Sequence, residues 1–151
     1  MKKALNERAR QRLDARLSKL KPAEDLRPPP KGWLRAIRTS LGMSASQLAR
    51  RMKIRPQSLE DIEKSEALGK IQLQTLRRVA SELDCTLVYA IVPNSSLEEM
   101  VRGRARKIAL RDLGRVSHTM KLEAQEITDA DLESRVTDYI KNVLRERDLW
   151  D

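Results

Sequence analysis

Aromatic side chains are scarce in this chain: they make up 3% of its 151 residues, and phenylalanine is absent. A hydrophobic core must therefore be built from aliphatic side chains. Recognition of RNA by stacking bases on interleaved aromatic rings is disfavoured for the same reason. Cys85 is the one cysteine, so no disulfide can form within the chain, and we expect a cytoplasmic protein.

Signals for membranes and for catalysis are also lacking. No apolar run approaches the roughly 18–20 residues of a membrane span. The N-terminus has two lysines but no apolar region behind them, so we expect no secretory signal. The one histidine, His118, has no acid–nucleophile pair beside it, and the chain carries no glycine-rich phosphate loop or zinc-ligand cluster. We expect that the protein is not an enzyme and that it binds no metal and no cofactor.

Positive charge, by contrast, is abundant. The net charge is +9 at neutral pH, and the sequence isoelectric point is near 10.0. Such a surface favours a polyanionic partner, above all double-stranded DNA, although it could equally meet an acidic protein. The length fits one domain with extensions better than two full domains.

Residues 33–87 have the pattern of a helix-turn-helix within a helical bundle. Ala49 is small, as a close crossing of two helices requires, and two short helices joined by a tight turn present the second helix to the major groove. The apolar positions are Leu48 and Met52 on the first helix, Ile54 in the turn, and Leu59 and Ile62 on the second.

The capping residues agree with this pattern. Ser44 followed by Gln47 three residues later predicts a capping box at the start of the first helix. Pro56 suits the first turn of the second helix, where its missing N–H costs nothing. Lys53 occupies the turn position where glycine is preferred if the backbone needs positive φ, at a cost of about 1 kcal/mol.

This stretch resembles the phage-repressor (Cro/C1, or XRE) family of helix-turn-helix domains. The resemblance implies a mainly α fold: a five-helix repressor-like bundle that binds DNA. Two positions depart from the family pattern, because Lys53 and Ser65 stand where glycine is usual. The matching residues are Ile37, Arg38, Leu41 and Gly42; Ser44, Gln47, Leu48 and Ala49; Pro56–Leu59, Ile62 and Glu63; and Leu73, Leu76, Ala80 and Leu83.

Within the second helix, Gln57, Ser58 and Asp61 are candidate base-reading residues. Gln can pair with adenine, Ser can serve several bases, and Asp61 could accept from cytosine or be a solvated surface acid. Glu60 and Glu63 are expected to be structural. Arg38 is expected to lie on the exposed side of the helix that comes before the two helices of the helix-turn-helix. The candidate phosphate contacts, each of which could also be a solvated charge, are Arg50, Arg51, Arg55, Lys64 and Lys70.

The apolar run Leu87–Val92 ends at Pro93 and predicts a short β-strand. A single strand leaves backbone groups and an apolar face unpaired, and no second convincing strand exists in the chain. Pairing with the same strand of a second copy would give a homodimer; the alternative is a buried extension of the preceding helix. The candidate dimerisation residues are Leu87, Val88, Tyr89, Ile91 and Val92.

Three segments are expected. Residues 1–30 form a basic helical arm with a leucine stripe (Leu5, Ala9, Leu13, Leu17 and Leu20) and a proline-rich linker, and residues 31–93 the DNA-binding domain with its strand. Residues 94–151 form C-terminal helices: one from Ser95 or Ser96 to about Glu123, and one starting at Thr128.

The whole layout resembles the small antitoxin regulators called mobile mystery protein A, which accompany Fic-domain toxins. The residues behind this are Trp33–Arg38, Leu87–Pro93 and Ser117–Gln125. The resemblance implies a repressor that is also the antitoxin of a toxin–antitoxin pair, with Thr119 and Glu123 as candidate toxin-inhibitory residues. In Fic-blocking helices a Gly or Asn follows the Glu, whereas Ala124 stands here, and Glu123 could simply be a surface acid. The alternatives are a protein-binding inhibitor or a transcription regulator without a toxin.

Overall fold

The computed structural model describes residues 2–120 and 128–151, which divide into two compact units. The central unit comprises residues 21–91, and the terminal unit combines residues up to 20 with residues 92–151. The predicted arm of residues 1–30 is therefore divided between the two units, because its residues up to 20 group with the C-terminal helices. The described residues form seven α-helices and no strand: α1 (Lys2–Leu17), α2 (Trp33–Ser40), α3 (Ala45–Met52), α4 (Pro56–Ala67), α5 (Leu73–Glu82), α6 (Leu97–Met120) and α7 (Asp129–Asn142).

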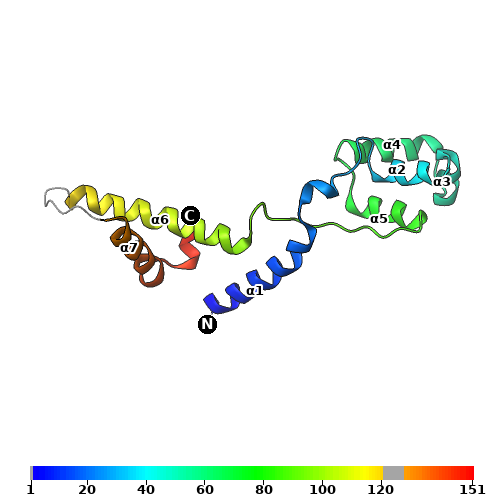
Figure 1. The fold of residues 1–151 in the computed structure, drawn as a ribbon. Coiled ribbons are helices and arrows are strands. Elements are labelled where there is room, and N and C mark those ends of the chain that lie inside the picture. The colour runs from blue at the N-terminus through cyan, green and yellow to red at the C-terminus, as the bar shows by residue number, and fades with distance from the viewer. Residues whose placement is uncertain (1, 121–127) are drawn as a thin grey trace. The chain divides into compact units, whose positions relative to one another are not determined.

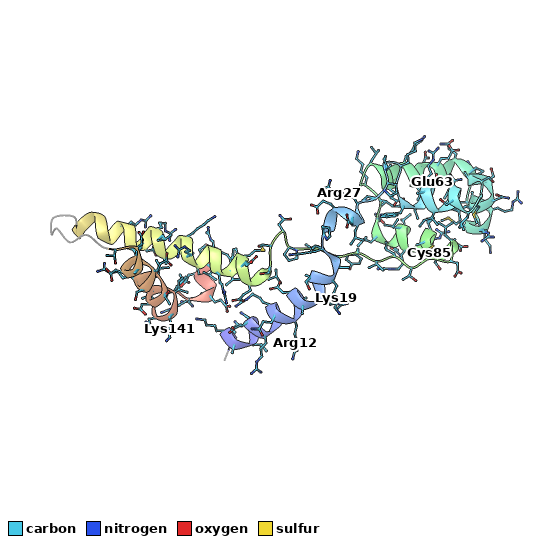
Figure 2. The ribbon with its side chains drawn as sticks, viewed as in Figure 1. Arg12, Lys19, Arg27, Glu63, Cys85 and Lys141 are labelled. Carbon is cyan, nitrogen blue, oxygen red and sulfur yellow. The ribbon has the colours of Figure 1, made fainter. Side chains whose placement is uncertain are left out.

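Helices α2 to α5 form the central unit, in which α4 lies beside both α2 and α3 (Figure 1). Its core is aliphatic, as the composition predicts, and Leu48, Leu59 and Val79 have no exposed surface. Ala49 is also fully buried, which lets α3 pack closely on its neighbours. The buried cluster consists of Leu34, Leu48, Ala49, Met52, Leu59, Val79 and Leu83.

The turn between α3 and α4 has the predicted local chemistry. The Ser44 side chain accepts from the Gln47 amide at 3.2 Å, and the Gln47 side chain accepts from the Ser44 amide at 2.8 Å, which confirms the capping box. Lys53 has φ 57° and ψ 39°, so the turn does require a left-handed residue. Pro56 occupies the first turn of α4, as expected.

The start of α2 is capped by a residue from another helix. Glu66 on α4 accepts from the backbone amides of Trp33 at 2.7 Å and Leu34 at 2.9 Å. This approach requires glycine at position 32, where φ is 86° and an added Cβ would lie 2.7 Å from the Glu66 carboxylate. The cap fixes the direction of α2 against α4.

The predicted strand Leu87–Val92 is wrong for the described chain, and the central unit has four α-helices rather than five. Asp84 with φ 55° follows the last turn of α5, and residues 85–93 then run without regular secondary structure. A strand needs a neighbouring strand to complete its ladder, and none of the described residues supplies one. Leu87 and Val92 are half-buried, whereas Val88, Tyr89 and Ile91 are exposed.

The terminal unit packs α1, α6, α7 and the short 3₁₀ helix Glu146–Leu149 together. Its small core contains Ala105, Ile108 and Leu149. The predicted caps are present: Ser96 accepts from the Glu99 amide at 3.1 Å, and Thr128 accepts from the Asp131 amide at 3.3 Å. None of the helices in the described part of the chain combines the length and the hydropathy of a membrane span.

Helix α1 attaches to this unit through hydrogen bonds of its polar side chains, and its leucine stripe is not fully buried. No residue of α1 is buried, and Leu5 and Leu13 keep 68% and 46% of their surface exposed. Asp14 instead accepts from the Leu97 amide at 2.8 Å and the Glu98 amide at 3.2 Å, which caps the start of α6. The sequence predicts the helix correctly but not the polar contacts that attach it.

Candidate DNA-binding site

The candidate site is the exposed face of α4. Leu59 and Glu63, one turn apart, are buried against the rest of the central unit. Gln57, Ser58 and Asp61 lie on the other side of the same helix and are exposed. The three predicted base-reading residues therefore share one accessible surface on a helix whose opposite face is held by the core.

Two of these residues are already joined. The Gln57 side-chain amide donates to the Asp61 carboxylate at 3.2 Å, across one helical turn. Gln57 keeps its amide oxygen as an acceptor and its second N–H as a donor, which is the pair of groups that the edge of an adenine requires. Asp61 thus orients the Gln57 amide in the unbound protein.

The predicted phosphate contacts surround this surface and are all exposed. Arg50 and Arg51 lie in the last turn of α3, and Arg55 is the residue before α4. Lys64 lies in the last turn of α4, and Lys70 follows that helix. Within the part of the chain that the structure describes, none of the five forms an ion pair, so their charges are available to a polyanion.

Arg38 is not exposed, contrary to the prediction. It is 7% exposed and pairs with Glu63, which is 5% exposed. The Arg38 Nε donates to Glu63 Oε1 at 2.6 Å and Nη2 to Oε2 at 3.1 Å. The hydrogen bonds that Arg38 donates to Glu63 raise the pKa of its guanidinium above the usual range, against the opposing effect of burial.

The structural role expected for Glu63 is confirmed, but its partner is Arg38 rather than a neighbouring cation on the same surface. A third Arg38 nitrogen donates to the Met43 carbonyl at 2.8 Å. One buried guanidinium therefore ties α2 to both the following loop and the buried face of α4. This contact fixes the helix that presents Gln57 and Asp61.

Two residues that position these helices belong to no recognisable sequence pattern. Arg78 on α5 donates to the Met52 carbonyl at 3.1 Å and so closes the last turn of α3. Glu66 caps α2, whose first residues lie 32 and 33 positions earlier in the chain. Neither partnership follows a local spacing rule, so only the packed fold brings these groups together.

The candidate inhibitory residues remain largely undescribed. Thr119 lies in the last turn of α6, and Glu123 falls outside the described residues. Among the residues that the structure covers, no cluster of three or more His, Cys, Asp or Glu side chains could hold a metal ion.

A family model for helix-turn-helix domains matches residues 34–89. The match spans α2 to α5 and agrees with the Cro/C1-type resemblance of residues 33–87. The central unit therefore carries a helix-turn-helix domain of the kind found in DNA-binding transcription regulators. No curated protein and no solved structure matches the chain.

Proposed function

We propose that this protein is a sequence-specific repressor that inserts α4 into the major groove of its operator. The observation that carries the proposal is the exposed Gln57–Asp61 pair on a helix fixed from behind by Leu59 and the Arg38–Glu63 ion pair. Gln57 and Ser58 read base edges, and Asp61 holds the Gln57 amide in register. The protein acts by binding, without a catalytic step.

Five cations position this helix on the duplex. Arg50 and Arg51 precede the turn, Arg55 borders the start of α4, and Lys64 and Lys70 border its end. Cations at both ends of a recognition helix can contact phosphates on the two sides of the groove. They supply affinity without sequence preference, whereas Gln57 and Ser58 supply discrimination.

We also propose that the repressor is a homodimer joined through residues 87–92. Val88, Tyr89 and Ile91 keep 77%, 65% and 89% of their surface exposed. No backbone hydrogen bond links residues 86–94 to other described residues. Pairing with a second copy would satisfy these backbone groups, cover the apolar side chains and place two recognition helices on successive major grooves.

Selection of bound sequences from a random duplex library tests the DNA proposal. We expect an enriched motif made of two inverted half-sites, with centres about one helical turn (34–36 Å) or a multiple of it apart. A gel shift with DNA from upstream of the gene, beside a scrambled duplex at physiological salt, gives the direct comparison. Equal retardation of the two duplexes, with no enriched motif, would exclude sequence-specific repression.

The terminal unit provides the surface for a second proposed activity, binding of a Fic-domain toxin. Helices α1, α6 and α7 border a groove of about 660 Å³. Its apolar floor includes Val101, Ala105, Val136 and Ile140, and charged side chains surround it. A helix-turn-helix domain does not need such a groove for contact with DNA. Together with the resemblance to antitoxin regulators, this groove supports an antitoxin that both neutralises its toxin and represses its own gene.

Thr137 offers a test that avoids the core, because it is exposed yet lines the groove. We expect Thr137→Arg to abolish neutralisation of a co-expressed Fic-domain toxin while operator binding persists. Asn142→Arg, at an exposed position outside the groove, is the matched control and should neutralise normally. Full neutralisation by both variants would exclude the groove as the toxin-binding surface. Toxin binding without any DNA binding would favour the protein-inhibitor alternative.

A further inference from the structure

Helix α1 presents two faces of different character. Its packed face carries Asn6, Arg10 and Asp14 at intervals of four residues, and all three bond to other parts of the terminal unit. Arg10 donates to Glu98 at 3.1 Å and Glu146 at 2.5 Å, and Asn6 donates to Glu146 at 2.9 Å. Asp14 caps α6. The three polar side chains of this face are therefore already hydrogen-bonded within the terminal unit.

The other face carries a row of three exposed arginines. Each of these arginines follows one residue of the packed face by two positions: Arg8, Arg12 and Arg16. Two positions correspond to about 200° around a helix, so the arginines lie on the side away from the packed face. All three are exposed, and none forms an ion pair with another described residue. The two acids of α1, Glu7 and Asp14, belong to the packed side, since Glu7 lines the groove and Asp14 caps α6.

We propose that Arg8, Arg12 and Arg16 form a second DNA-contact surface, which binds duplex phosphates without reading sequence. The proposal takes DNA as its partner from the proposed function and adds a surface in a different unit from the helix-turn-helix. Side chains four residues apart on a helix are about 5–6 Å apart, so the three arginines span about 12 Å along α1. That length covers several phosphates of one strand, which succeed one another every 3.4 Å along the DNA axis.

The composition of the helix argues for DNA over a membrane surface. A basic helix that lies on a bilayer needs a broad apolar face opposite its cations. Here that opposite side is occupied by Asn6, Arg10 and Asp14, which bond to the rest of the unit. Free guanidinium groups in a row without an intervening acid match a row of phosphates.

The test compares the full chain with a triple variant, R8Q/R12Q/R16Q, on a duplex of random sequence. We expect the variant to bind about tenfold more weakly at 0.1 M salt. The slope of log affinity against log salt should become shallower by about 2–3, because each lost phosphate contact removes about 0.9. The triple lysine variant R8K/R12K/R16K keeps the charge and should retain most of the affinity.

A control with the same loss of charge separates a local surface from overall net charge. Arg135, Lys141 and Arg145 are exposed cations of the terminal unit without an ion pair among the described residues, so R135Q/K141Q/R145Q is the matched variant. Equal weakening by both glutamine triples, or no weakening by the α1 triple, would overturn the proposal. Loss of binding to anionic phosphatidylserine vesicles with unchanged DNA affinity would also overturn it, in favour of a membrane surface.

The random duplex keeps this test separate from the proposed repressor function. The protein could fail to discriminate its operator while the α1 triple variant still binds random duplex more weakly than its control. That result would exclude sequence-specific repression and support the phosphate-binding surface on α1. Circular dichroism of each variant checks that helix content is unchanged, as expected for side chains that point away from the packed face.

Discussion

Arg38 and Glu63 form a two-pronged ion pair inside the central unit, with bonds of 2.6 and 3.1 Å between side chains that are 7% and 5% exposed. The pair joins α2 to the inner face of α4, two residues after Asp61. Because two charges removed from water are stable only as a pair, the orientation of the recognition helix depends on both partners.

Replacing one partner should therefore be costly. We expect Glu63→Ala to destabilise the central unit by about 3–5 kcal/mol, since the Arg38 charge would stay buried without a counter-ion. Native-state hydrogen exchange of the α3 and α4 amides measures this loss in the central unit alone. The double variant R38M/E63L, which replaces the pair with apolar groups, should recover most of the stability. A single variant no less stable than the double would contradict this account of the pair.

Lys53 gives a prediction in the opposite direction. Its backbone has φ 57°, a conformation that costs a non-glycine residue about 1–2 kcal/mol. We expect Lys53→Gly to stabilise the central unit by about 0.5–1 kcal/mol after allowing for the greater freedom of glycine in the unfolded chain. Lys53→Val should destabilise it. Urea unfolding of the three proteins provides the measurement, and a glycine variant less stable than the parent would show that the lysine side chain contributes more than the strain costs.

The helix-turn-helix was predictable because its determinants are local. The capping box of Ser44 and Gln47, the proline at the start of α4 and the apolar spacing of Leu48 and Leu59 each act within one or two helical turns. Exposure of Gln57 and Asp61 follows from the same periodicity. The caps at Ser96 and Thr128 were predictable for the same reason.

Features that depend on distant partners were not predictable. Burial of Arg38 requires Glu63, which is 25 positions away, and attachment of α1 requires Asp14 to meet an amide 83 positions away. The run Leu87–Val92 has strand composition, but strand formation depends on a partner that composition cannot supply. The leucines of α1 lie at helical spacing, yet none of them is fully buried, and hydrogen bonds of polar side chains attach the helix.

Base reading can be tested through the Gln57–Asp61 pair. We expect Gln57→Ala to reduce discrimination at one base position by about 1–3 kcal/mol, the range for a good base-edge contact. Asp61→Ala leaves Gln57 in place but frees its amide, so it should relax preference at the same base position by a smaller amount. Competition binding with single-base operator variants gives both values. Equal losses on operator and random DNA for Gln57→Ala would remove this residue from the reading surface.

Phosphate contact by the central unit predicts a different signature. We expect Arg51→Ala to weaken binding to operator and random DNA alike and to make the salt slope shallower by about 1. Arg27 is a suitable comparison, because it is an exposed arginine of the same unit that pairs weakly with Glu24 at 3.9 Å. Arg27→Ala should leave the salt slope unchanged. A change confined to the operator would instead make Arg51 a base-reading residue.

Attachment of α1 should weaken in acid. The hydrogen bond from Arg10 lowers the pKa of the Glu146 carboxyl below its ordinary value, with a smaller effect from Asn6. A carboxyl whose pKa is lower in the folded state stabilises the fold above its unfolded pKa of about 4.3, and this stabilisation is lost as pH falls through the folded value. We therefore expect exchange protection of the α1 amides, corrected for intrinsic rates, to hold steady above about pH 5 and to decline below it.

Arg10→Met separates this pair from general acid unfolding. The variant should show less protection of α1 at pH 7, and the two proteins should converge at low pH, where Glu146 is protonated in both. Helix α3 serves as an internal reference, because it belongs to the other unit. A constant difference in α1 protection between parent and variant from pH 7 to pH 3 would mean that ionisation of Glu146 does not control the attachment of the helix.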